Sequence, residues 1–145
     1  MANGQQFRRP GYNTQPTQVY TPTDADLDKI IKEGDAGLIN QVCEKLGKLY
    51  ATDNKDLKIK KLSTSQIRKV FDRIQRMDVE GFDRNQLQLL RPMLAYAAGR
   101  NKDGWITDLQ KLMEKVIPRV EANNFKNFVN FFEAIVAYHR LHGGD

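Results

Sequence analysis

Apolar residues recur at helical spacing from residue 24 to the end of the chain. The clearest case is residues 63–77, whose apolar side chains gather on one arc of a wheel turning about 100° per residue. They are Ile67, Val70, Phe71, Ile74 and Met77. Ser63 and Gln66 have the spacing of a capping box, which begins a helix. Since no stretch alternates between apolar and polar residues as a strand does, the pattern predicts an all-α fold.

Helix-start and helix-stop signals divide the rest of the chain into further helices. We expect a kink or a tighter turn at Pro92, which lies inside one of them. Together they predict a compact bundle of five to six helices. The other expected helices are Asp24–Glu33 after the cap Thr23, a helix from the cap Asp35 to Tyr50, Arg84–Ala98, a helix from Thr107 or Asp108 to near Glu121, and Phe125–Leu141 after Asn123 or Asn124.

The N-terminal segment differs from the rest of the chain in composition. It is rich in Gln, Asn, Thr, Pro and Gly and has few aliphatic residues, which is typical of disordered chain. We therefore predict a disordered polar tail at residues 1–22 and a single helical-bundle domain at residues 23–145. A total of 145 residues is consistent with one domain and a tail.

The composition of the chain also indicates the cellular compartment in which the protein is expected. No apolar run approaches the ~18 residues of a membrane span, and the N-terminus has no hydrophobic stretch of the kind a secretory signal needs. The single cysteine, Cys43, can form no internal disulfide, so we expect a cytoplasmic protein that does not bind membranes. We interpret Cys43, and His139 on the broad apolar face of residues 125–141, as core residues.

Side chains that could support catalysis or metal binding are scattered. One Cys and two His do not form a set of metal ligands. The sequence has no glycine-rich phosphate loop, nucleophile elbow or Ser/Cys–His pairing with an orienting group. We therefore predict that the protein is not an enzyme and uses no cofactor or metal.

Positive charge is concentrated in residues 63–100. The chain carries a net charge of +5, and this segment holds seven basic residues against four acidic ones, which favours an acidic partner. On the wheel Lys69, Arg73 and Arg76 fall together beside the apolar arc, and Arg68 falls on its other side. Such a row can follow phosphates, because arginine donates hydrogen bonds in a planar fork. A solvated charged face is the alternative interpretation.

A second candidate surface lies in LRPMLAYAAGR, residues 90–100. Ala95, Ala98 and Gly99 are expected to form a smooth outer strip beside Arg91, with Arg100 just past the helix end. Small side chains let another backbone approach closely, either a sugar-phosphate chain or a neighbouring helix. We expect the cations of the two helices to converge on one ridge.

Three stretches, STSQIRKVFDRIQRM, LRPMLAYAAGR and FVNFFEAIVAYHRLHGG, together resemble the small helical subunit of type III-A (Csm) CRISPR interference complexes. The likeness covers about residues 60–144. It implies a non-catalytic subunit that stacks head to tail in several copies along the guide RNA and contacts the backbone of the target RNA. Its other partners would be the larger subunits of the complex. The expected RNA-binding residues are Arg68, Lys69, Arg91, Arg100 and Arg140 from the resemblance, with Lys61 and Arg73 added as neighbouring cations.

Two alternatives remain open. One is a helix-turn-helix DNA-binding regulator with residues 63–77 in the major groove, although the first turn of that helix lacks the Asn, Gln and Arg cluster that base readout needs. The other is a helical adaptor whose basic face meets an acidic protein and which has no nucleic-acid role. The leading prediction is an RNA-backbone-binding subunit, because phosphate contacts give affinity without reading bases.

Overall fold

A computed structural model describes residues 19–144, and it confirms the all-α prediction for this part of the chain. The tail that we predict to be disordered lies, up to residue 18, outside the described residues. Val19 and Tyr20 pack against the core, so the packed part of the chain begins ahead of Thr23. The described residues form six α-helices and two short 3₁₀ turns. They are α1 (Asp24–Ile31), α2 (Ala36–Tyr50), α3 (Thr64–Glu80), α4 (Arg84–Arg100), α5 (Ile106–Val116), η2 (Ile117–Arg119), η3 (Ala122–Asn124) and α6 (Phe125–Leu141).

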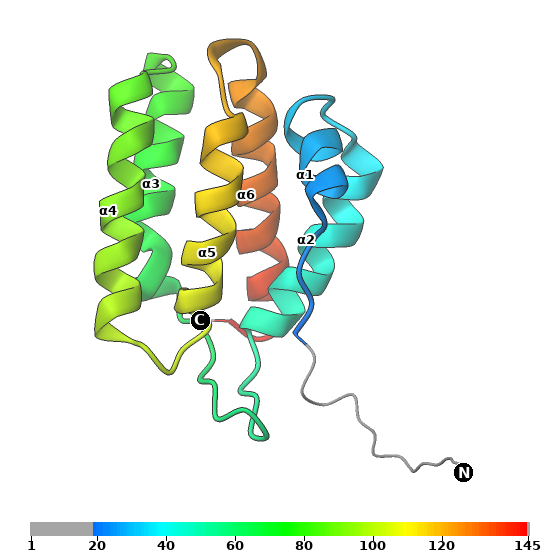
Figure 1. The fold of residues 1–145 in the computed structure, drawn as a ribbon, viewed down its shortest axis with the longest axis vertical. Helices are drawn as coiled ribbons and strands as arrows, with labels where there is room; N and C mark the ends of the chain where they lie inside the picture. The colour runs from blue at the N-terminus through cyan, green and yellow to red at the C-terminus, as the bar shows by residue number, and fades with distance from the viewer. Residues whose placement is uncertain (1–18, 145) are drawn as a thin grey trace.

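The helices run roughly side by side along the long axis of the molecule (Figure 1). Helix α6 is central: it contacts α1, α2 and α3, and its contact with α2 is the most extensive between two elements. Helices α3 and α4 form an antiparallel hairpin at one side of the bundle, closed against the rest by α5 and α6. The hairpin therefore presents its outer surface to solvent, and it carries most of the predicted binding residues.

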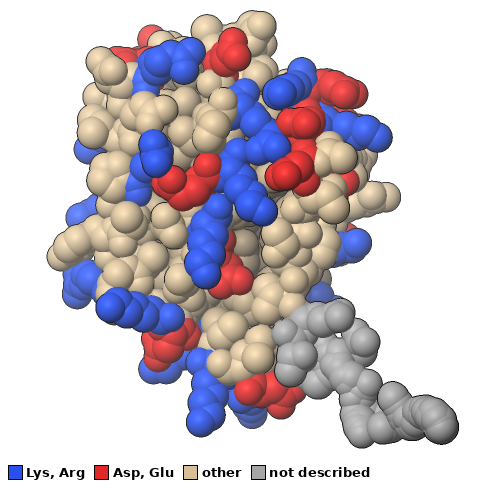
Figure 2. Space-filling model, viewed as in Figure 1, with Lys and Arg blue, Asp and Glu red and all other residues tan. Residues whose placement is uncertain are grey.

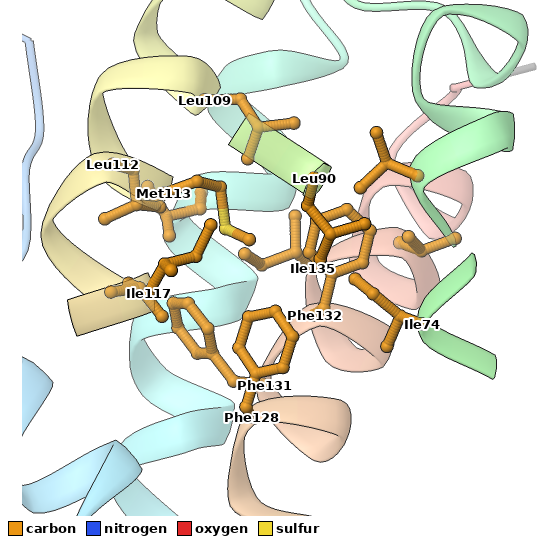
Figure 3. Packing of buried hydrophobic residues seen from close by; sticks show 14 of the residues in the cluster. Ile74, Leu90, Leu109, Leu112, Met113, Ile117, Phe128, Phe131, Phe132 and Ile135 are labelled. Carbon is orange, nitrogen blue, oxygen red and sulfur yellow. The ribbon is translucent and has the colours of Figure 1, made fainter. Parts of the chain in front are cut away.

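The core is built around the apolar face of α6. Figure 3 shows that phenylalanine rings of α6 meet side chains of α3, α4 and α5 in one cluster. Each fully buried side chain of this size stabilises the fold by about 1.5–3 kcal/mol relative to exposure, so this cluster fixes how the α3–α4 hairpin is seated. The residues that meet there are Ile74, Leu90, Leu109, Met113, Phe128, Phe131, Phe132 and Ile135.

A glycine lets α2 and α6 approach closely. A Cβ atom added at Gly47 would lie 2.6 Å from the backbone nitrogen of His139 and 2.6 Å from the carbonyl carbon of Tyr138. Gly47 lowers the helix propensity of α2, but it makes possible a close approach between the backbones of α2 and α6. His139 is fully buried beside it and its Nε2 pairs with the carbonyl of Leu62, so the interpretation of His139 as a core residue is confirmed.

Several predicted helix starts are confirmed by their caps. The Asp35 carboxylate accepts a hydrogen bond from the amide of Leu38 at 3.1 Å. At α3, the Ser63 amide donates to Oε1 of Gln66 at 2.8 Å, as a capping box requires. These caps satisfy amides that the helix itself leaves without acceptors. They set where α2 and α3 begin.

Other boundaries differ from the prediction. Helix α5 starts at Ile106, ahead of Thr107, because Trp105 is buried and its indole N–H donates to the carbonyl of Thr52 at 2.8 Å. This tertiary anchor fixes the start of the helix without a side-chain cap. Helix α1 ends at Ile31, earlier than expected, and α4 continues to Arg100. At Pro92, where we expect a kink or a tighter turn, α4 remains an α-helix on both sides of the proline.

Candidate nucleic-acid interface

A groove runs between α3 and α4 on the outside of the hairpin, and we call it the α3–α4 groove. It encloses about 780 Å³ and its walls carry three cationic side chains and no carboxylate. Its base is apolar, and polar groups close one end. The lining residues are Ser65, Gln66, Lys69, Val70, Arg73, Leu89, Pro92, Met93, Tyr96, Ala97, Arg100 and Asn101.

The heptad-like pattern of α3 explains why its cations reach this groove. Val70 and Ile74 are buried in the core, so Lys69 and Arg73, each one position earlier in the chain, lie on the flank of α3 that faces α4. The guanidinium of Arg73 is half-buried and donates from Nη1 to Oε1 of Gln86 at 3.2 Å. This hydrogen bond to a neutral group orients Arg73 and leaves its charge uncompensated. The predicted grouping of Lys69 with Arg73 is confirmed.

Helix α4 supplies the third cation of the groove. The guanidinium of Arg100 lies 5.7 Å from the centre of the Tyr96 ring, close enough for a cation–π interaction. Tyr96 is one helical turn earlier and its side chain is 68% exposed. The groove therefore combines three cations with an accessible aromatic ring.

The cations of the groove have no acidic partner within residues 19–144. The ion pairs of this part of the chain join other residues, such as Lys60 with Asp103 and Lys126 with Asp78. Lys69, Arg73 and Arg100 take part in none of them. Since no carboxylate of the described residues neutralises their charges, they are available to an anion.

The positive character of the groove fades toward the turn between α3 and α4. There the groove continues past Arg76 to Glu80 and Asp83, whose carboxylates balance the cations of this stretch. The electrostatic attraction for a polyanion is therefore concentrated at the end of the groove that holds Lys69 and Arg100.

Two predicted residues lie on the other side of α3. Arg68 and Arg140 line a smaller depression between α3 and α6, together with Phe71, Asp72 and Val136. The structure thus brings Arg68 and Arg140 together, but it separates them from the α3–α4 groove. The carboxylate of Asp72 reduces the net charge of this depression.

Arg91, which we also predict to bind RNA, is paired with an acidic residue of the protein. Its Nε and Nη2 atoms donate to the two carboxylate oxygens of Glu114 at 3.0 and 2.7 Å, which links α4 to α5. This bidentate hydrogen bonding raises the pKa of Arg91 above its usual value and lowers the pKa of Glu114. Figure 2 shows that basic and acidic side chains are interspersed on the face formed by α1, α4 and α5. That face offers a polyanion no uniform attraction.

The single ridge that we expected is therefore not formed. Lys69, Arg73 and Arg100 share the groove, Arg68 and Arg140 share the depression, and Arg91 is paired with Glu114. Lys61 is exposed ahead of α3, where its amide donates to Asp53 at 2.8 Å, and it lines neither surface.

The expected smooth strip on α4 is wrong in one of its members. Ala98 is buried against the bundle, while Ala95 and Gly99 remain exposed. The exposed groove wall of α4 instead carries Leu89 and Tyr96, neither of which we selected from the sequence.

Three further features of the described residues concern a metal site, a reactive thiol and a membrane span. Within residues 19–144 no group of three or more His, Cys, Asp or Glu side chains is placed to hold a metal ion. Cys43 is buried, as predicted, with its thiol 3.4 Å from the carbonyl of Phe131, and burial raises its thiol pKa. A thiol of this kind is a poor nucleophile. No helix in this part of the chain has the length and apolarity needed to cross a membrane.

Comparison with known proteins places the chain in a family. A family model described as Csm2 Type III-A matches residues 40–145, which include both walls of the α3–α4 groove. Neither the comparison with curated proteins nor that with solved structures gave a match. The family match covers more than half of the chain and agrees with the resemblance carried by the three sequence stretches. The chain therefore belongs to the Csm2 family, the small subunit of type III-A Csm effector complexes of CRISPR systems.

Proposed function

We propose that this small subunit is a non-catalytic RNA-binding protein that contacts the backbone of the target RNA through the α3–α4 groove. One observation carries the proposal: the groove holds three cations that no carboxylate neutralises within the described residues. RNA is the polyanion of a guide-RNA effector complex. Binding would add phosphate as the missing counter-charge and release the cations condensed on the RNA.

The positions of these cations suit a linear polyanion. At 1.5 Å per helical residue, Lys69 and Arg73 are separated by about 6 Å along α3. Arg100 lies on the opposite wall, toward the end of the groove where α3 begins. Cations on both walls can hold one strand between them without contacting base edges. Phosphate contacts of this kind give affinity and register but no sequence readout, as a subunit that accepts any target requires.

Three cations per subunit give weak binding for an isolated copy. Several copies arranged along one RNA would bind far more tightly, because each later contact is made at a high effective concentration. We therefore propose that the subunit acts as repeated copies along the filament of guide RNA and target RNA.

Two features of the bundle support head-to-tail stacking. Helices α3 and α6 end at opposite ends of the molecule (Figure 1), and the last turn of each exposes a large apolar side chain. Val79 on α3 is 86% exposed and Leu141 on α6 is 69% exposed. Different patches at opposite ends are what a heterologous, repeating contact requires.

The charges of the two ends are complementary. The connections 32–35, 81–83 and 117–124, at the end where α3 finishes, hold four acidic and two basic residues. The connections 51–63 and 101–105, at the other end, hold three acidic and five basic residues. Opposite net charges favour the contact of one copy's acidic end with the next copy's basic end.

Replacing Leu141 with aspartate should reduce the number of copies in each effector complex. The substitution puts a carboxylate in the apolar contact between copies, while its exposed position leaves the free chain folded. The measurement is the mass of purified complexes by native mass spectrometry. Asn130→Asp, an exposed change of the same charge midway along α6, is the control and should leave the copy number unchanged. An unchanged copy number with Leu141→Asp would exclude this end from the stacking contact.

The RNA-binding proposal is tested in the assembled complex. A Lys69→Gln, Arg73→Gln variant should assemble with the larger subunits and the guide RNA but retain less target RNA than wild type in a filter-binding assay. Arg91→Gln is the matched control, because Arg91 is already paired with Glu114, and it should retain target RNA normally. Unchanged retention of target RNA by the variant complex would contradict the proposal, and loss of assembly would instead favour the adaptor that has no nucleic-acid role.

A further inference from the structure

Tyr96 stands out among the exposed side chains because it is aromatic and lies in the cationic groove. Tyr96 is 68% exposed and Leu89 is 48% exposed, and both lie in the same wall of the groove. The packing of the described chain does not explain them, since neither belongs to the core or packs against it. They are surfaces that a ligand could cover.

The groove has a cationic part and an apolar part, which match the phosphate and the base of a nucleotide. Its cations lie on the walls, at Lys69, Arg73 and Arg100, while Pro92 and Met93 give it an apolar part on α4 beside the Tyr96 ring. The cations on the walls suit a phosphate, and the apolar part beside Tyr96 suits a flat, weakly polar base. Backbone binding alone would use the cations and leave the tyrosine unused.

Arg100 restricts the orientation of the Tyr96 ring. Its guanidinium lies 5.7 Å from the Tyr96 ring centre. An arginine over a tyrosine ring limits the ring's rotation, and the Tyr96 side chain is still 68% exposed. Aromatic rings fixed beside cations are the common means by which proteins bind single strands without regard to sequence, because every base has a π-face.

We propose that the α3–α4 groove holds one strand of RNA, with one unpaired nucleobase stacked on Tyr96 while Lys69, Arg73 and Arg100 hold the adjoining phosphates. This inference rests on the proposed function and narrows it from a polyanion to an RNA strand that offers one accessible base. A paired base is stacked between its neighbours in the duplex, so only an unpaired base of the strand can reach Tyr96. The three cations and the lack of carboxylates in the groove lining favour RNA as its occupant over a basic peptide.

The test compares two oligomers of equal length and charge, an oligoadenylate and the same ribose-phosphate chain without bases. The free chain should bind the oligoadenylate about tenfold more tightly at low salt, as expected for one stacked base. Tyr96→Ala should remove this preference and leave affinity for the abasic oligomer unchanged. Tyr96→Phe, which keeps the ring, should retain the preference.

Lys69→Gln serves as the second arm, because it should weaken binding to both oligomers by the same factor. If Tyr96→Ala keeps the preference for bases, or weakens both oligomers equally, the stacking inference is overturned while the proposed function stands. If Lys69→Gln weakens neither oligomer, the proposed function itself is contradicted. If Tyr96→Ala leaves both affinities intact but prevents assembly of the complex, the groove is a protein contact and the stacking inference is also overturned.

Discussion

Replacing Gly47 with alanine is expected to destabilise the fold by about 3 kcal/mol, the upper part of the range for overpacking a core. Alanine is the better helix former, and in an open helix the change would stabilise by about 0.5–1 kcal/mol. At Gly47 the steric effect is larger, because the new Cβ would lie 2.6 Å from backbone atoms of α6. Backbone cannot rotate away as a side chain can, so α2 and α6 must separate along their shared interface.

The measurement is urea-induced unfolding followed by circular dichroism, with the midpoint compared between variants. Gly99→Ala is a matched control, because Gly99 is also helical and a Cβ there meets nothing within 4 Å. It should stabilise the chain by about 0.5–1 kcal/mol. If Gly47→Ala raises the midpoint as Gly99→Ala does, the close backbone contact between α2 and α6 is absent in solution.

The helices could be predicted from the sequence wherever a local signal defines them. The box formed by Ser63 and Gln66 sets the start of α3, and the Asp35 cap sets the start of α2. The start of α5 could not be found in this way. It depends on Trp105, whose indole is bound to the carbonyl of Thr52, a residue 53 positions earlier, and no local pattern records such a contact.

The candidate site could be predicted only in part. Lys69 and Arg73 are one turn apart on α3, so the helical wheel correctly places them together. Arg91 and Arg100 are nine residues apart, about two and a half turns, which puts them on opposite sides of α4. That arithmetic was sufficient to separate them. The pairing of Arg91 with Glu114 could not be predicted from the sequence, because it depends on how α4 packs against α5.

Tyr96 could have been found from the same spacing. It precedes Arg100 by four residues and follows Leu89 by seven, so all three share one face of α4. The strip of small residues predicted for this helix instead included Ala98, which is buried. An exposed aromatic residue one turn from an arginine is the better sequence signal for a single-strand binding surface.

Neutralising the groove has the largest effect expected on RNA binding. The triple variant Lys69→Gln, Arg73→Gln, Arg100→Gln should bind single-stranded RNA about 100-fold more weakly than wild type at 0.1 M salt. Each phosphate contact with a single strand contributes about 0.7 to the slope of log K against log salt, and three contacts contribute about 2. The three side chains are on the surface of the hairpin and pair with no carboxylate in residues 19–144, so the variant should fold normally.

The most direct test of the account is the salt dependence of RNA binding by the free chain. We predict that the slope of log K against log salt is shallower by about 2 in the triple variant, so that the two affinities converge near 1 M salt. Arg91→Gln should keep the wild-type slope, because its charge is already balanced by Glu114. Two results would contradict the assignment of RNA binding to the α3–α4 groove. One is a triple variant that keeps the wild-type slope, and the other is a slope that falls more in Arg91→Gln than in the triple variant.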